Sequence, residues 1–227
     1  MKAGAGGARL FLLLMLAVVA GVGYTAFSGI AVYTQLDSGG RELVAAQAGL
    51  AGASRSGDSR QLAAAAAELR QAERDFDAAR DRASHDPALR LVGHVDLAGR
   101  QIQATARLGA IGADISGAGE SAASIALRVD ALRRQYAGQA ITPDSLPALL
   151  KQSETIAAQY SASARRIGDQ LRAAHAERAA VNTEGLVQPL RDAYQQVDAA
   201  LADAQAAFAR YQDVRRLLAD LLGVPVL

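Results

Sequence analysis

The side chains that most often bind metals or carry catalysis are few in this sequence and are spread apart. The chain has three histidines, His85, His94 and His175, and no cysteine. None of them has a second histidine at the i, i+4 spacing that places two metal ligands on one face of a helix. Without cysteine there are no thiolate metal sites and no disulfides. We expect the histidines to lie near helix ends or on polar faces, and we expect no metal, no cofactor and no catalytic residue.

One short segment matches the spacing of a nucleotide-binding loop. Gly117, Gly119 and Ala122 fit the bare G-x-G-x-x-A pattern. A dinucleotide site, however, needs a strand before the glycines and a βαβ unit around them, and here a helical pattern of apolar residues continues through the segment. We interpret these glycines, with Gly109 and Gly112, as places where two helices come close or where the helix is soft. No G-x-S-x-G nucleophile turn is present either, so the sequence predicts a protein that is not an enzyme.

The charged side chains give no sign of a nucleic-acid surface. Lys+Arg is 24 and Asp+Glu is 23, a formal net charge of +1, whereas nucleic-acid binding needs a clustered excess of positive charge. Basic pairs such as Arg133-Arg134 and Arg165-Arg166 alternate with acidic residues along the chain, so we interpret them as solvated helix faces. Neither a nucleic acid nor a small-molecule ligand is expected as a partner.

The longest apolar stretch lies near the N-terminus and would decide where the rest of the chain resides. Residues 10–33 are 24 residues without a charge, and about 20 apolar residues cross the hydrocarbon layer as a helix. Lys2 and Arg9 precede this run, and positive flanks favour the cytoplasmic side. The sequence predicts a short cytoplasmic N-terminus, 1–9, a transmembrane helix, 10–33, and an extracytoplasmic remainder, as in a single-pass protein of the cell membrane. The competing interpretation is a signal peptide cleaved after Ala20.

Small residues recur every fourth position within this apolar run. They are Ala17, Gly21, Thr25 and Gly29, a small-xxx-small stripe that lets two membrane helices approach closely. We take these four residues as the candidate helix–helix contact in the membrane. The competing interpretation is that the stripe is incidental, because alanine and glycine are common throughout the chain.

Beyond the run, apolar residues recur at steps of three and four, which is helical spacing. We predict a juxtamembrane helix and turn over 34–58 and a helical bundle over 59–223. The segment from Arg41 to about Ala53 would continue the anchor helix, with Gly39-Gly40 as a weak point. A further stripe runs from Leu97 to Tyr136, and others lie within 146–174 and 190–221. The last residues, 224–227, would suit the entry to a further domain. The clearest stripe, within 60–83, consists of Leu62, Ala66, Leu69, Ala72, Phe76, Ala79 and Ala83.

Narrow stripes flanked by alanine predict long helices that pack closely side by side. The fold class we expect is all-α, with a single N-terminal transmembrane helix followed by an alanine-rich antiparallel helical bundle or coiled-coil stalk. Charged residues between the stripes would pair on the solvated faces, for example Arg70 with Glu73 and Arg74 with Asp77. Each such pair contributes only a few tenths of a kcal/mol.

The order of these segments resembles a known family. It comprises one anchor, a Gly57-Asp58-Ser59 turn, a break at His85-Asp86-Pro87, a Val92-Gly93-His94 segment, and a last helix that ends at Leu222-Gly223. This layout resembles the N-terminal membrane-anchored helical region of the bacterial domain-of-unknown-function family 4012. The resemblance implies an envelope protein linked to surface polysaccharide. In that family a mixed α/β domain follows the helical region, and the resemblance carries no functional residue onto this chain.

Three functions remain open at this stage. The first is a non-catalytic, membrane-tethered extracytoplasmic scaffold or stalk, whose partners are the lipid bilayer and either an envelope protein or a second copy of the chain. The second is a sensory or ligand-binding helical bundle, which a pocket between the helices would support. The third is the leading piece of an envelope enzyme whose catalytic domain lies further along.

Overall fold

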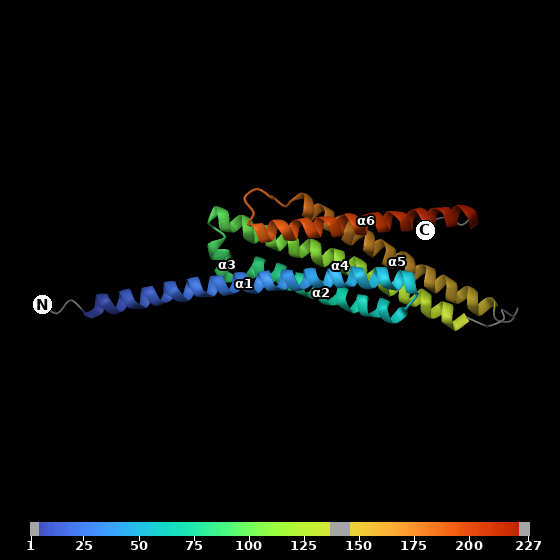
Figure 1. Cartoon of the computed structure of the whole chain (residues 1–227), viewed down its shortest axis with the longest axis horizontal. Coiled ribbons are helices and arrows are strands. Elements are labelled where there is room, and N and C mark those ends of the chain that lie inside the picture. Colours follow the sequence, from blue (N-terminus) through green and yellow to red (C-terminus); the bar gives the residue numbers. More distant parts are fainter. Residues whose placement is uncertain (1–4, 137–145, 223–227) are drawn as a thin grey trace.

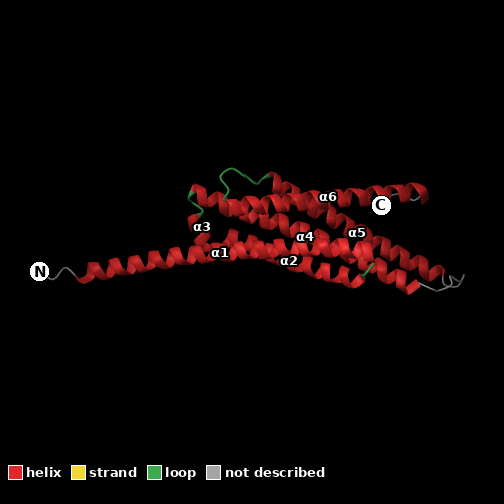
Figure 2. Cartoon of the chain, viewed as in Figure 1, coloured by secondary structure: helices red, strands yellow, loops and turns green. Residues whose placement is uncertain are grey.

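The computed structural model describes the backbone of residues 5–136 and 146–222 and the side chains of 28–131, 134–135, 160–210 and 212. Over this part of the chain all regular structure is helical, and no strand is present (Figure 2). The prediction of an all-α chain with a helical bundle is therefore confirmed. The helices are α1 (Ala5–Ser56), α2 (Ser59–His85), α3 (Pro87–Val92), α4 (Asp96–Tyr136), α5 (Leu146–Ala179) and α6 (Gln188–Leu222).

The long helices run back and forth along one axis (Figure 1). α1 and α2 form a hairpin, α3 lies at the end of α2, and α4, α5 and α6 follow in alternating directions. α4 is the central helix, because among the described elements it contacts each of the others. The N-terminal part of α1 projects beyond the bundle past α3, at the end opposite to that at which α6 finishes.

The predicted membrane span, 10–33, falls largely on α1 residues whose side chains lie outside the described part of the chain. The same holds for Ala17, Gly21 and Thr25 of the small-residue stripe. Within the part of the chain that the structure describes, none of the helices has an apolar stretch of the length that a membrane span requires. The last residues of the run are described, and there Ser28 and Val32 are buried against the bundle.

The segment after Gly39-Gly40 continues the preceding helix as predicted, because α1 runs through both glycines as one helix of 52 residues. The ring of Phe76, from α2, occupies the space beside Gly39, and a Cβ added to that glycine would lie 3.1 Å from the ring carbons. A close packing partner thus holds the helix where its own sequence is weakest.

The turn predicted near Asp58 is confirmed. Gly57 has a φ of +67°, and the Asp58 carboxylate accepts from the N–H of Arg60 at 2.8 Å, as an N-cap does.

The stripe predicted for α2 is confirmed almost residue for residue. All its members are buried except Leu62, which is half-buried, and Ala65 joins them. The stripe faces α1 on one side and α4 on the other. In the middle of α4 the apolar positions Leu108, Ile111 and Ile115 are buried as predicted. Leu97, in the first turn of α4, is 67% exposed, and Ala122 and Val129, further along α4, are also exposed. The predicted stripe is therefore wrong at these positions on either side of the buried middle.

The glycines of α4 lie where neighbouring helices come close. A Cβ added to Gly109 would lie 2.8 Å from the carbonyl oxygen of Phe76, and one added to Gly112 would lie 2.6 Å from the Phe76 ring. Gly119 faces Leu69 in the same way, at 3.0 Å. The interpretation of these glycines as close helix contacts is confirmed, since a side chain at any of them would push α2 away.

Two side chains hold the short connections. Asp86 caps α3 by accepting from the N–H groups of Ala88 and Leu89 at 2.9 and 3.2 Å. It also accepts from the hydroxyl of Ser28 at 3.0 Å, which ties α1 to the start of α3. At the α5–α6 connection, the amide of Gln101 donates to the carbonyl of Gly185 at 2.8 Å and accepts from the N–H of Val187 at 3.1 Å.

The ion pairs differ from those predicted within α2. The Nε of Arg70 lies 3.4 Å from the Oε1 of Glu120, on the neighbouring helix α4. The partner expected from the sequence was Glu73, on the same helix. Asp77 pairs with Arg80 at 3.9 Å, whereas Arg74 donates to the side chain of Gln71. Sequence spacing identifies only partners on the same helix, whereas Arg70 reaches a partner on the next helix.

Candidate functional site

An apolar groove of about 760 Å³ lies between α1, α4, α5 and α6. This volume lies in the range of pockets that hold small ligands, about 300–1,000 Å³. The side chains around it come from all four helices and from Leu69 of α2. Its larger apolar side chains include Leu43, Leu50, Ile115, Ile125, Ile167 and Phe208.

The groove exists because small side chains face it where the helices diverge. Ala122, Ala126, Ala164 and Ala207 line its walls, and alanine fills little of the space between two helices. α6 contacts α4 more extensively than it contacts α5 or α1. The helices are therefore held together at α4 and leave a hollow beside it. The groove was not predicted from the sequence, although alanine at successive positions next to a leucine stripe was the signal that could have indicated it.

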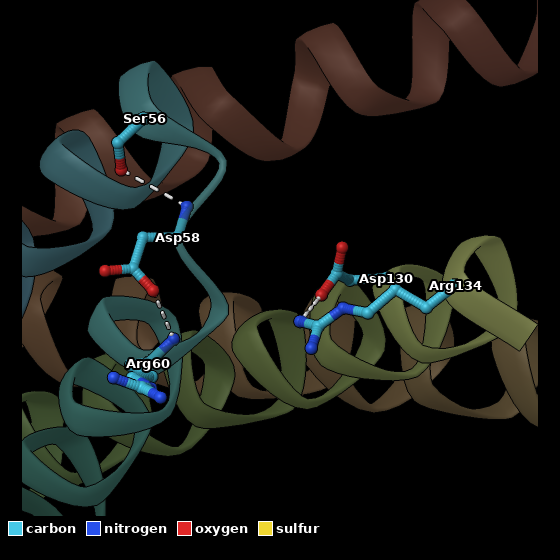
Figure 3. Close-up of polar contacts among 5 residues, drawn as sticks. All are labelled: Ser56, Asp58, Arg60, Asp130 and Arg134. Carbon is cyan, nitrogen blue, oxygen red and sulfur yellow. Dashed lines mark hydrogen bonds and ion pairs between the residues drawn. The ribbon is translucent and has the colours of Figure 1, made fainter. Parts of the chain in front are cut away.

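Few polar groups reach the groove. Gln47, Asp130, Tyr160 and Asp203 are the side chains with polar atoms in its lining. Asp130 is held by Arg134 one helical turn further along α4 (Figure 3). No nucleophile and base are brought together among these residues. The shape and mostly apolar lining of the groove suit an apolar body with a polar end.

A second groove, of about 660 Å³, lies between α5 and α6 and is more polar. Arg165, Asp169, Arg172 and His175 line it from α5. Arg172 pairs with Asp169 on the same helix, so part of its charge is already matched. The Arg165-Arg166 pair of the sequence analysis lies on exposed surface here, as predicted for a solvated face.

The structure does not bring the three histidines together. His85 ends α2 with its Nδ1 3.1 Å from the carbonyl oxygen of Asp81, His94 lies between α3 and α4, and His175 is exposed on α5. In the described ranges no three His, Cys, Asp or Glu side chains converge as a metal site. Gly117 and Gly119 lie inside α4, so the G-x-G-x-x-A segment is helix and not the strand-to-helix turn that binds a dinucleotide.

Charged side chains form a layer where α2, α4 and α5 meet. Arg107 of α4 and Glu177 of α5 are 2.8 Å apart. Burial raises the pKa of the Asp114 carboxyl from 3.8 to about 6, an effect that Arg80 opposes and Asp77 reinforces. The folded chain therefore holds the Asp114 proton more tightly than the unfolded chain does. The free energy of unfolding should accordingly fall as the pH rises from about 4 to about 6.

Of the candidate membrane contact, only Gly29 has a described side-chain environment. It is exposed, and a Cβ added there would meet nothing within 4 Å. Ala17, Gly21 and Thr25 lie outside the residues whose side chains are described, so the contact stays a prediction.

No family model, no curated protein and no solved structure matches the chain. The resemblance to family 4012 therefore also stays a prediction.

Proposed function

We propose that the chain is a membrane-anchored, non-catalytic scaffold or stalk of the bacterial cell envelope, with its bundle outside the cytoplasmic membrane. The observation that carries the proposal is the continuity of α1. One helix contains the uncharged run 10–33 and then packs along α2 within the bundle. Because α1 has no break between the two parts, the position of the N-terminal segment would fix the position of the bundle. The link to surface polysaccharide rests on the family resemblance alone.

The packing of Ser28 and Val32 refines the boundary of the proposed anchor. Ser28 donates to Asp86 at 3.0 Å, and Val32 is buried in the bundle. A residue that packs against the bundle is not free to face lipid, so we place the end of the span before Ser28. Residues 10–27 then remain, and 18 residues of helix are about 27 Å long, close to the hydrocarbon thickness of about 30 Å.

Membrane extraction of the full chain tests this proposal. The chain, produced in bacteria, should stay with the membranes through a carbonate wash and float with them on a density gradient. Replacing Val18 by Arg places a charge in the middle of the run, at a cost of about 3 kcal/mol, and should release part of the chain. Val44→Arg is the matched control, because Val44 is apolar but 60% exposed on the bundle. Release of the unaltered chain by carbonate would refute the anchor.

The apolar groove favours a second candidate function, the binding of an apolar or amphipathic small molecule. Its volume and its mostly apolar lining are the specific support. A naphthylamine dye that fluoresces in apolar surroundings should bind the full chain, and Ala122→Phe should weaken that binding by filling the groove. Ala131 is exposed on α4 and is not part of the lining, so Ala131→Phe should leave binding unchanged. Equal dye binding by both variants would reject this function.

A further inference from the structure

Most of the large apolar side chains exposed on the described surface lie at one end of the bundle. Eight are exposed in all, and two of these, Val44 and Val129, lie on α1 and α4 away from that end. The others belong to the entry of α1, to α3 and the start of α4, and to the α5–α6 connection, which share the end from which α1 projects (Figure 1). We call them the α3-end residues: Ile30, Tyr33, Leu91, Val95, Leu97 and Val187, each between 50% and 74% exposed.

Specific contacts bring these separate segments together. The Ser28 hydroxyl bonds to Asp86 at 3.0 Å and thereby sets α3 beside the α1 residues Ile30 and Tyr33. Gln101 in α4 binds the backbone of the α5–α6 connection, including the N–H of Val187 at 3.1 Å. The arrangement is therefore built by hydrogen bonds, and the apolar side chains project from a fixed end of the bundle.

We propose that the α3-end residues rest in the interfacial layer of the lipid bilayer from which α1 emerges. This inference rests on the proposed anchor. If residues 10–27 cross the membrane, the lipid surface lies at the level of residues 28–33, which is the level of α3 because Ser28 contacts Asp86. Apolar side chains at that level would leave water for lipid, and Tyr33 is of the residue type that is enriched at this depth.

The charges at this end indicate the kind of lipid contact. Arg90 and Arg100 are exposed there, but so are Asp96 and Glu184. Because both signs are present, attraction to anionic headgroups would be largely offset by repulsion. The proposed contact therefore depends on apolar insertion and does not require anionic lipid.

The chain contains no cysteine, which allows a clean depth measurement. The full chain carrying Leu91→Cys or Leu97→Cys would be labelled with an environment-sensitive fluorophore and reconstituted into phosphatidylcholine vesicles. Insertion into the lipid layer should shift the emission of both labels to the blue. Lipids carrying a nitroxide near the headgroup should then quench both labels. The matched controls are Val44→Cys and Val129→Cys, which are exposed to 60% and 50% but lie away from this end. Their labels should keep their fluorescence.

The outcomes separate this inference from the anchor itself. Equal quenching at the α3-end and control positions, in chain that floats with the vesicles after carbonate, would overturn the inference and leave the anchor standing. Chain that does not float would overturn both. In a separate sample, a pyrene label at Leu91→Cys that shows concentration-dependent excimer emission, where the environment-sensitive label is not quenched by lipid, would assign this end to a second copy of the chain and would also overturn the inference.

Discussion

Replacing Gly112 by alanine tests the close packing on which the bundle depends. In an exposed helix, Gly→Ala stabilises a protein by about 1 kcal/mol, because alanine loses less backbone entropy on folding. At Gly112 the added Cβ would lie 2.6 Å from the ring of Phe76. That ring is only 2% exposed and also packs on Gly39, so it has no free space into which to move.

The two effects oppose each other, and the structure decides which is larger. Forcing a methyl group into a packed core costs about 1–3 kcal/mol, which exceeds the gain in helix propensity. We expect Gly112→Ala to destabilise the full chain by about 1 kcal/mol, and to lower the midpoint of thermal unfolding by about 2–4 °C. The assay is the loss of helical circular dichroism on heating, in a mild detergent.

Gly40→Ala is the matched control, since a Cβ there would meet only the side chain of Gln196, at 4.0 Å. This variant should raise the midpoint by an amount of similar size. Phe76→Leu should relieve the contact, so that Gly112→Ala costs less in the Phe76→Leu background than in the native one. A rise in the midpoint on Gly112→Ala alone would refute the close approach of α2 and α4.

Three further predictions follow from the described contacts. Asp114→Asn should raise the midpoint at neutral pH and flatten its decline between about pH 4 and about 6, because the substitution removes the carboxyl whose pKa burial raises; thermal unfolding across that pH range checks it. Gln101→Ala should speed amide hydrogen exchange at Val187, since its two hydrogen bonds hold the α5–α6 connection; an unchanged rate would contradict this. Leu69→Ala should cost about 2–5 kcal/mol because the side chain is buried, whereas Leu97→Ala should change unfolding by less than about 0.5 kcal/mol; comparable losses would refute the assigned burial.

The sequence was sufficient for those features that depend on a single helix. The α2 stripe and the Gly57-Asp58-Ser59 turn follow from three-four spacing and from the residue types of the turn, and both are confirmed. Leu97 fits the same spacing but is exposed. Its burial was wrongly predicted because periodicity identifies a face of a helix and does not show whether another helix lies opposite that face. The pair of Arg70 with Glu120 was not predicted for the same reason, because the two residues lie on different helices.

The groove, and the contact that supports α1 at Gly39-Gly40, could not be predicted from local patterns. The groove depends on the distances between four helices, which are set by the packing of α4 against its neighbours. The weak Gly39-Gly40 pair is supported by Phe76, a residue some 37 positions further along the chain. Both features arise only when distant segments are brought together.

The most direct test of the account is the side of the membrane on which the bundle lies. Ser54 is exposed on α1 near its end in the bundle, and Ser54→Cys would be the only cysteine in the chain. A membrane-impermeant maleimide should label this variant in intact bacterial cells, whereas Ala3→Cys, before the apolar run, should react only after the cells are opened. Labelling of Ser54→Cys only in opened cells would contradict the account.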